Sequence, residues 1–394
     1  MTPGFIKKGF NWQRRMAETV NIVITGDTHL GGGRVCELAR ENDAEGLFGD
    51  FLPLFRDADL AITNLESPIT ASGKPIEKTG PNLKSPPDTL PVLKKAGFDL
   101  VTLANNHIMD YGDEGLENTL NECRKAGIDT VGAGMSSEDS IKPFIKNING
   151  ISVAVVNIAE NEFGTTQNGD PGGHAMDPVQ NYYAIRDAAA RADRVIVIVH
   201  GGHEHYELPS PRMKKTYRFY ADAGADAVVG HHTHCISGYE RYNGVPIFYS
   251  LGNFLFDNNN SKELTGWNKG VICSLTFNDT GEVDLQLQPY IQGYRTGGLE
   301  MPAGQSGDEI RNNLALLNEI IQKDDTLKEK FEEYCSRSGR LYSSYIEPHS
   351  VRIVHALRNR NMLPPLLSGR KRLLYQNLIR CEAHRDVLLK TLTS

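Results

Sequence analysis

Five short clusters of carboxylate, amide and imidazole side chains stand out along this chain, and each directly follows an apolar run. Their members are Asp27 and His29; Asn64 and Glu66; Asn105, Asn106 and His107; His200; and His231, His232 and His234. Side chains of these types are the ligands with which proteins hold divalent metal ions. The clusters therefore predict a metal centre, provided that the fold brings them together.

A pair of divalent ions about 3.5–4 Å apart needs an anionic carboxylate that can bridge both ions. Asp27 and His29 are separated by one residue, so both can reach one ion from a single turn. Glu66 and Asn106 add a second acid and a neutral amide oxygen. These residues could hold two ions and still leave a position for water or a substrate.

Three imidazoles complete the set, at His200, His232 and His234. We expect residues 232 and 234 to lie on an extended chain, where alternate side chains point to the same side. Their rings could then serve two neighbouring ions. Cys235, which follows this cluster, is either a neighbour of the ligands or a small packed residue.

The elements that must position these clusters are strands. The apolar runs before the clusters are typical of buried strands and lie at residues 20–25, 58–63, 98–103, 195–199 and 225–229. Segments 92–97 and 116–127 have the pattern of helices that end at a glycine. Further strands are expected at 151–157, 246–252, 270–277 and 283–288. Such alternation places the carboxyl ends of strands on one rim, where ligands bind.

Longer motifs surround the clusters. They are NLESP at 64–68, LANNH at 103–107, DYG at 110–112, GAG at 132–134, HGGHE at 200–204, GADAVVGHHTH at 224–234, YSLGNF at 249–254 and FD at 256–257. Over about residues 20–260 the chain resembles the CapA-like branch of the calcineurin-like metallophosphatase superfamily, a branch named for poly-gamma-glutamate capsule biosynthesis. The resemblance implies a four-layer α/β/β/α sandwich with a helical C-terminal extension, whereas the strand pattern alone indicates only a mixed α/β domain.

The resemblance also implies two metal shells that share Glu66. One would comprise Asp27, His29, Glu66 and His234, and the other Glu66, Asn106, His200 and His232. The cofactors would be two divalent ions of Mn, Fe or Zn. Glu66 stands where the superfamily has an aspartate, and His29 is present although many members of the branch lack it. His231 is an additional residue whose role the sequence leaves open.

Four residues are candidates for acid–base chemistry. The resemblance implies that His107 faces the substrate, where it would stabilise charge or donate a proton to the leaving group. Asp110 either orients this ring or caps the helix expected near residue 113. His203 and Glu204 follow His200 closely and are further acid–base candidates.

Three other polar residues have two interpretations each. Lys84 and Arg212 lie on loops at the rim, either as contacts for an anion or as ordinary surface charges. Asn253 either supports the metal ligands or is a turn residue.

The chain divides by composition into an N-terminal arm at 1–19, the CapA-like domain at 20–300 and a helical extension at 301–394. The extension holds 15 of the 42 Lys and Arg residues and 11 of the 49 Asp and Glu residues, so it is basic and the remainder is acidic. Helices are expected at 309–323 and 326–338, followed by two segments broken at Pro364 and Pro365. The basic, amphipathic segment 352–390 is either a cap packed on the main domain or a helix that binds a membrane surface or a protein partner.

Bulk properties exclude several classes. The formal net charge of −7 argues against a nucleic-acid binder, which would carry a basic footprint. No apolar run reaches the length that a bilayer requires. The N-terminus lacks the apolar core of a secretory signal, so we expect a cytoplasmic protein, or one peripheral to the inner membrane. The six cysteines are scattered without a CxxC pair, so we expect reduced, mostly buried thiols.

The leading hypothesis is a metal-dependent hydrolase that acts on a phosphoester or related bond. The resemblance places it in capsule, exopolysaccharide or poly-gamma-glutamate metabolism, with an anionic small molecule, peptide or polymer as substrate. One alternative is a metal-dependent peptide epimerase, in which a histidine base removes a proton next to a polarised carbonyl. Another is a non-enzymatic accessory protein for capsule assembly.

Overall fold

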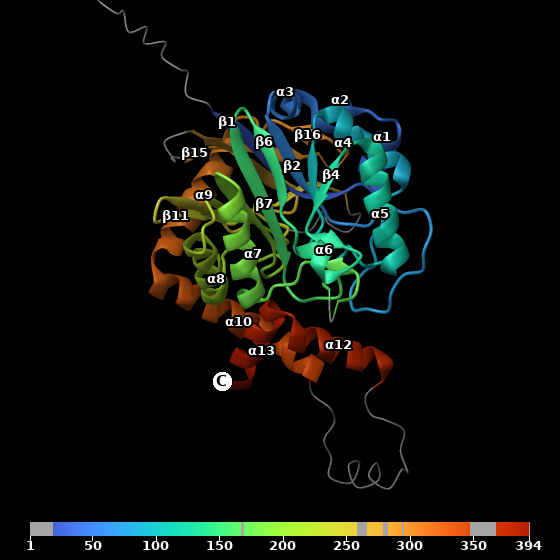
Figure 1. Cartoon of the computed structure of the whole chain (residues 1–394). Coiled ribbons are helices and arrows are strands. Elements are labelled where there is room, and N and C mark those ends of the chain that lie inside the picture. Colours follow the sequence, from blue (N-terminus) through green and yellow to red (C-terminus); the bar gives the residue numbers. More distant parts are fainter. Residues whose placement is uncertain are drawn as a thin grey trace, which may run out of the picture.

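Two β-sheets pack face to face between two layers of helices (Figure 1). The computed structural model describes residues 19–166, 169–257, 266–278, 283–293, 295–346 and 368–393. The predicted α/β/β/α sandwich with C-terminal helices is confirmed. The predicted break at Pro364 and Pro365, residues 352–367 of the basic segment and most of the N-terminal arm lie outside the described residues.

The first sheet has the strand order β16-β15-β14-β1-β2-β3-β4, and β13 pairs with the end of β1. Its strands are β1 (Val20–His29), β2 (Leu60–Leu65), β3 (Leu100–Thr102), β4 (Asp129–Val131), β13 (Asn253–Phe256), β14 (Lys269–Phe277), β15 (Val283–Gln292) and β16 (Leu299–Glu300). Strands β1 to β4 are parallel neighbours. Their carboxyl ends, which carry the first three clusters, therefore meet at one edge of the sheet.

The second sheet has the order β11-β12-β10-β9-β7-β6. Its strands are β6 (Phe144–Ile148), β7 (Ile151–Ala159), β9 (Arg194–His200), β10 (Ala227–His231), β11 (Tyr239–Tyr242) and β12 (Val245–Phe248). Because β7, β9 and β10 are parallel, the ends of β9 and β10 bring the two remaining clusters to the same edge. A separate pair, β5 (Ala133–Gly134) and β8 (Gly172–Gly173), is antiparallel.

Alternate side chains of β1 point to opposite faces of the sheet and are buried in two different apolar clusters. Ile22 and Ile24 are fully buried between the sheets, whereas Val23 is buried in the outer cluster beneath the helices. The helices around this outer cluster are α1 (Gly33–Arg40), α2 (Ala44–Phe48), α3 (Leu52–Arg56), α4 (Pro91–Ala96) and α5 (Gly112–Ala126). On the second sheet, α7 (Pro178–Arg191) and α8 (Pro211–Asp222) cover the opposite outer face. The short helix α6 (Ser137–Ile141) packs on β5.

The two predicted glycine helix ends are present. Helix α4 ends at Gly97 with φ 111°, and α5 ends at Gly127 with φ 68°. Only glycine adopts this left-handed conformation without a Cβ penalty, so each glycine both stops its helix and turns the chain toward the next strand.

The C-terminal extension is packed on the sandwich. It contains α9 (Gln305–Gln322), α10 (Asp324–Ile346), α12 (Gly369–Arg380) and α13 (Glu382–Thr393). Ile310 of α9 enters the core between the sheets, and Ile321 enters the cluster beneath α8. Helices α10, α12 and α13, here called the cap, share a small apolar cluster of Cys335, Leu378 and Val387.

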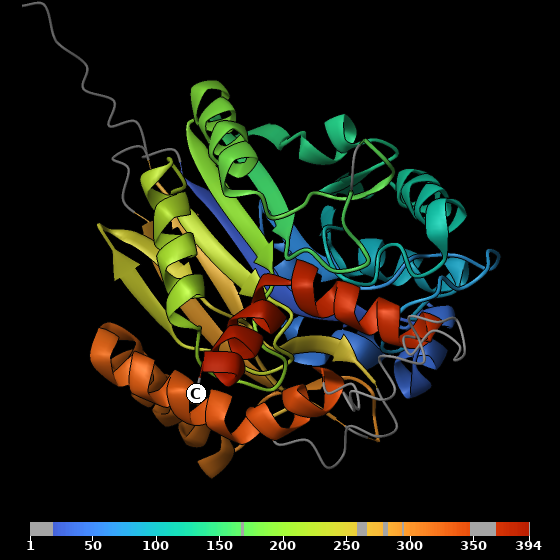
Figure 2. The same cartoon turned by 90° about the horizontal axis from the view of Figure 1, so that it is seen from below.

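The cap lies across one end of the sandwich, at the bottom of Figure 1, and Figure 2 views this end directly. The described part of the basic segment is thus packed as a cap; binding to a membrane surface or a protein partner stays a prediction.

None of the helices described combines the length and the apolarity that crossing a bilayer demands. All six cysteines lie within the described residues and are free, and all except Cys36 are buried.

The buried ring of His174 is held in its neutral form. Its Nδ1 donates to the carbonyl of Asn157 at 3.0 Å, which leaves Nε2 to accept from the amide of Asn181 at 3.0 Å. A proton on Nε2 would remove that acceptor. Burial lowers the pKa of His174 to about 4 from its ordinary value of 6.5.

We predict that His174 makes the fold sensitive to mild acid. As the pH falls from 6.5 toward 4, the unfolded chain takes up a proton that the folded chain does not, so stability is lost. At about pH 5 the loss from this residue is about 2 kcal/mol. Urea unfolding of wild type and His174→Gln near pH 7.5 and pH 5 should show that the variant loses about 2 kcal/mol less. An equal loss in both proteins would contradict the prediction.

Candidate metal centre and active site

The carboxylate of Glu66 lies at the middle of the five clusters. Glu66 follows β2 directly, its side chain is 0% exposed, and neither of its oxygens has a hydrogen-bond partner. Oε1 lies 3.6 Å from Nε2 of His200 and 3.9 Å from Nε2 of His234. Ligand candidates from both sheets therefore converge on one buried carboxylate.

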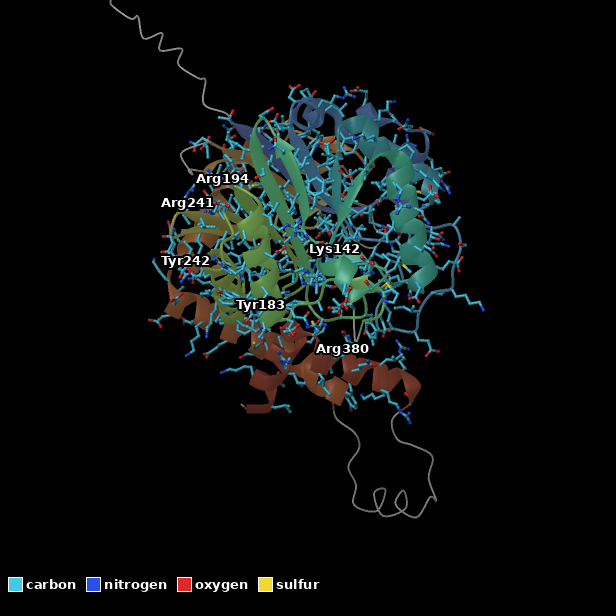
Figure 3. All side chains as sticks on the ribbon, in the orientation of Figure 1. Lys142, Tyr183, Arg194, Arg241, Tyr242 and Arg380 are labelled. Atoms are coloured by element: carbon cyan, nitrogen blue, oxygen red, sulfur yellow. The ribbon has the colours of Figure 1, made fainter. Side chains whose placement is uncertain are left out.

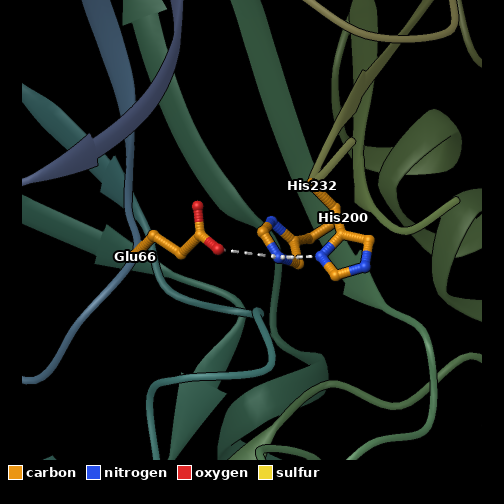
Figure 4. A group of neighbouring side chains, drawn as sticks. All are labelled: Glu66, His200 and His232. Carbon is orange, nitrogen blue, oxygen red and sulfur yellow. Dashed lines mark hydrogen bonds and ion pairs between the residues drawn. The ribbon is translucent and has the colours of Figure 1, made fainter. Parts of the chain in front are cut away.

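Two groups of ligand atoms share this carboxylate. One is Glu66, His200 and His232 (Figure 4), and the other is Asp27, Glu66 and His234. Within each group the ligand atoms lie within 4.8 Å of one another. Apart from His29 and Asn106, this grouping coincides with the two shells that the resemblance implies.

Asn106 adjoins the first group. Its Oδ1 lies 3.0 Å from Nε2 of His200, and the same nitrogen is 3.1 Å from Nδ1 of His232. Two imidazole nitrogens and an amide oxygen thus face one small region beside Glu66. Asp27, Glu66, Asn106, His200, His232 and His234 are called the Glu66 centre below.

The donor set fits divalent cations. Burial, followed by repulsion from Asp27, raises the pKa of Glu66 well above its ordinary value. A buried carboxylate without a hydrogen bond is strongly unfavourable unless a cation or a proton compensates it. The surrounding imidazole and carboxylate groups favour a cation, because they offer lone pairs at short range.

Hydrogen bonds to neighbouring residues orient the side chains of the candidate metal ligands. Oδ1 of Asp27 accepts from the amide of Asn64 at 2.7 Å, and Oδ2 accepts from the backbone N–H of His232 at 2.9 Å. Nδ1 of His234 donates to Oδ1 of Asn253 at 2.8 Å, which leaves Nε2 to face Glu66. Asn253 therefore contacts a metal-ligand candidate, in addition to beginning β13. Such contacts set the tautomer and orientation of metal ligands.

The backbone of the histidine cluster differs from our expectation. The expected extended chain is wrong, because His232 has φ 92° and His234 has φ 57°, both in the left-handed region. Such a conformation costs a residue with a Cβ of order 1–3 kcal/mol, and strain of this kind clusters at functional sites. The bend after β10, not strand alternation, turns both rings toward Glu66.

His29 and His231 take different positions from the other histidines. His29 ends β1, its ring lies 5.2 Å from that of Phe256, and burial lowers its pKa to about 3. Among the described residues it belongs to neither close-packed ligand group, so its role as a ligand stays a prediction. Nε2 of His231 donates to the carbonyl of Thr25 at 2.9 Å, which ties β10 to β1.

His107 forms a buried dyad with Asp110. Its Nδ1 lies 2.6 Å from Oδ2 of Asp110, whose other oxygen contacts the ammonium of Lys78. The backbone N–H of Leu83 also donates to Asp110, at 2.6 Å. Helix α5 begins at Gly112 without a side-chain cap, so Asp110 orients His107 instead of capping the helix.

Lys78 is the residue of this site that the sequence did not indicate. Its side chain is 3% exposed, and its Nζ lies 3.1 Å from Nδ1 of His107. It belongs to a loop without helix or strand periodicity, so no pattern singled it out. Burial and the charge of Lys78 lower the pKa of His107, and the hydrogen bond to Asp110 opposes this shift.

The other acid–base candidates have separate surroundings. Nε2 of His203 donates to the carbonyl of Ala383 in the cap at 3.0 Å. This contact gives His203 a structural role, and its catalytic role stays a prediction. Glu204 is exposed in the cleft described below, where an acid–base role is open to it.

Both cationic rim residues have partners within the protein, and Arg212 lies in the first turn of α8 instead of on a loop. Arg212 contacts two carboxylates, Glu160 at 2.5 Å and Asp386 of α13 at 2.6 Å. Its charge is therefore neutralised within the protein. Lys84 lies over the ring of Tyr111, 4.7 Å from its centroid.

A cleft of about 1010 Å³ connects the Glu66 centre to the cap. On one side it is lined by Asn106, His107, Glu204 and His232, and on the other by Arg370, Lys371, Asn377 and His384. This volume is at the upper end of ordinary small-molecule sites. The cap therefore forms one wall of the candidate active site.

The chain is similar to known bacterial capsule proteins over most of the sandwich. The sequence model of a family described as "Bacterial capsule synthesis protein PGA_cap" matches residues 21–258. Over 246 residues the chain is 35% identical to the PGA biosynthesis protein CapA of Bacillus subtilis, covering 61% of this chain and 64% of that protein. Over 291 residues it is 31% identical to the capsule biosynthesis protein CapA of Bacillus anthracis, covering 70% and 68%.

A more distant relative is named a probable polyglutamine synthesis accessory protein, from Mycobacterium tuberculosis. It is 31% identical over 213 residues, which are 50% of this chain and 56% of that protein. The match to the Bacillus subtilis protein, at 64%, spans slightly less than two thirds of that relative's length.

We predict that removing the charge of Glu66 stabilises the metal-free protein. In the presence of a chelator, Glu66→Gln should raise the free energy of unfolding by roughly 1–3 kcal/mol, because a neutral amide is less costly to bury than an unpaired carboxylate. Mn²⁺ should stabilise wild type through preferential binding to the folded state, but should not stabilise the variant. Urea unfolding with chelator and with Mn²⁺ measures both effects.

The matched control is Glu77→Gln, which neutralises an exposed carboxylate of the same cleft. It should behave as wild type under both conditions. If Glu66→Gln unfolds as wild type does in chelator and is still stabilised by Mn²⁺, Glu66 is not the shared ligand.

Proposed function

Because the chain belongs to the bacterial capsule synthesis protein family, we propose that it is a metal-dependent hydrolase of capsule-polymer metabolism. The reaction would break a phosphoester or related bond. The observation that carries this proposal is that two groups of candidate metal ligands share one unpaired, buried carboxylate, Glu66. A centre for two ions is the arrangement that many hydrolases of phosphoesters use.

The residues that would hold the ions are those of the Glu66 centre. Asp27, Glu66 and His234 would hold one ion, and Glu66, His200 and His232, with Asn106, would hold the other. When bound, divalent ions supply a hydroxide nucleophile at neutral pH and stabilise negative charge that develops in the transition state.

His107 would move a proton at the border between this centre and the cleft. Because Asp110 accepts from Nδ1, Nε2 is the ring nitrogen left for exchange with a substrate or water. Asp110 stabilises the ring when it carries a positive charge, and Lys78 holds Asp110 in place. The dyad thus supplies general acid–base assistance in a fixed orientation.

The names of the relatives support a polymer as the substrate. The Bacillus relatives are named for the biosynthesis of PGA or of the capsule, and we extend this context to the present chain. The cleft has room for more than one unit of a polymer. Arg370 and Lys371 lie on the cap wall, so we expect an anionic group of the substrate to bind on that side.

A non-catalytic accessory role is the second candidate, and the printed name of the Mycobacterium tuberculosis relative favours it. The His107–Asp110 dyad also suits proton abstraction, as in a peptide epimerase. The three functions differ in what they require. The epimerase and the hydrolase need metal and His107, whereas the accessory role needs neither.

We predict that the Mn²⁺-loaded protein hydrolyses phosphomonoester or phosphodiester substrates. His107→Ala should lower kcat by about 10²–10⁴-fold, the usual contribution of a general acid or base, with the metal content unchanged. Steady-state kinetics and elemental analysis of the same samples measure both quantities. Glu66→Gln should instead lose metal and activity together.

Two results would contradict the hydrolase. One is a folded protein that takes up no metal, which would leave the accessory role. The other is a metal-loaded protein that is inert toward every phosphoester but exchanges solvent deuterium into a peptide, which would favour the epimerase.

A further inference from the structure

The cap is attached to the sandwich through a loop that follows β7. Asn161 of this loop contacts Glu382 at the start of α13 twice, through its backbone N–H at 3.2 Å and its side-chain amide at 2.7 Å. Arg380, labelled at the boundary between the cap and the sandwich in Figure 3, lies 3.4 Å from the carbonyl of Glu162 through Nη2. The loop and the beginning of α13 are therefore held together by several contacts.

Three side chains of different chemistry meet within this contact. Sγ of Cys381 lies 3.6 Å from Oε1 of Glu162, and Nε2 of His384 lies 3.6 Å from the same oxygen. All three ligand atoms lie within 4.8 Å of one another. Cys381 is buried, whereas Glu162 and His384 border the cleft.

We propose that Glu162, Cys381 and His384 form a further divalent-metal site, separate from the Glu66 centre, that binds Zn²⁺ and fastens the cap to the sandwich. The site shares no residue with the Glu66 centre and lies outside the chemistry of hydrolysis. It would join segments that are about 220 residues apart in the chain, as the contacts of Glu162 with the cap already do.

The spacing of the ligand atoms agrees with a tetrahedral site. Zinc bonds of about 2.0–2.3 Å at tetrahedral angles place neighbouring ligand atoms roughly 3.4–3.7 Å apart. The two measured separations from Oε1 of Glu162, both 3.6 Å, lie in this range. The third separation, between Sγ of Cys381 and Nε2 of His384, is no more than 4.8 Å, so these two atoms would close by at most about 1 Å around an ion.

The ligand types select the metal. A thiolate, an imidazole and a carboxylate suit Zn²⁺ better than Mn²⁺ or Mg²⁺, which prefer oxygen ligands. A thiolate and a carboxylate also match the charge of one divalent ion. Without metal, Sγ of Cys381 donates to Oε1 of Glu162, and zinc would displace that proton.

Three protein ligands leave one position of a tetrahedral ion open. Because Glu162 and His384 line the cleft, this position would be reached from the cleft by water or by a group of the substrate. Zinc would thereby hold the wall of the cleft in place, and its removal would loosen the cap. The site would thus stabilise the wall of the cleft through which a substrate passes, and it is not a part of the Glu66 centre.

The test uses the full-length chain loaded with Co²⁺ and, separately, with Zn²⁺. A thiolate bound to Co²⁺ produces charge-transfer absorption in the near ultraviolet, and none of the ligands of the Glu66 centre is a thiolate. Wild type should show this absorption. Cys381→Ser should lack it and should retain one zinc fewer per chain by elemental analysis.

Three further variants make the result specific. Cys335→Ser changes another buried cysteine of the cap and should keep both the absorption and the zinc. His384→Gln, which changes another of the three ligands, should also lose one zinc. Glu66→Gln should keep the absorption while it loses metal from the Glu66 centre, so that failure of one site is distinguished from failure of the other.

Zinc should also slow proteolytic cleavage of the cap in wild type, but not in Cys381→Ser. The proposal is overturned if wild type lacks the thiolate absorption, if Cys381→Ser retains the wild-type number of zinc ions, or if Cys335→Ser loses as much zinc as Cys381→Ser.

Discussion

The unpaired, buried carboxylate of Glu66 is the constraint on which the arrangement of the two sheets depends. It follows a strand of one sheet, whereas its nearest imidazoles, His200 and His234, follow strands of the other. Such a carboxylate is tolerable only where a cation or a proton compensates it. The edges of both sheets must therefore stay in one fixed relation. Among the bonds that cross between the sheets are those from His231 to the carbonyl of Thr25 and from the backbone N–H of His232 to Asp27.

These cross-sheet bonds also account for the strained histidine loop. His232 and His234 adopt backbone conformations with positive φ, which are uncommon for residues that carry a Cβ. The N–H of His232 is engaged by Asp27, and the ring of His234 is engaged by Asn253, so both conformations are determined by contacts on either side. The strain is thus maintained by the packing of the sheets and results in two imidazoles that face one carboxylate.

The fold and the centre of the site could be predicted because their signals are local. Apolar runs of strand length gave β1, β2, β9 and β10, and polar residues directly after them had to meet at one edge. The contributions of loops could not be predicted in this way. Lys78 reaches His107 from a segment without periodicity, and His203 binds Ala383, 180 residues later in the chain. The extended geometry expected for residues 232 and 234 failed because backbone strain leaves no mark in composition.

The cap is coupled by a chain of bonds to the loop that follows His200, one of the candidate metal ligands. Glu160 accepts from the backbone N–H of Gly202, two residues after His200, at 3.0 Å, and from Arg212 at 2.5 Å. Arg212 in turn donates to Asp386 of α13 at 2.6 Å. Displacement of α13 would leave the half-buried Arg212 with one carboxylate, Glu160, instead of two. Glu160 also accepts from Gly202, so the change would reach the loop that follows His200. The family match ends at residue 258, before the cap begins, yet the cap is bonded to the loop that carries a ligand of the Glu66 centre. The part of the chain outside the matched region therefore shapes the cleft and supports the geometry of the candidate metal ligands at the same time.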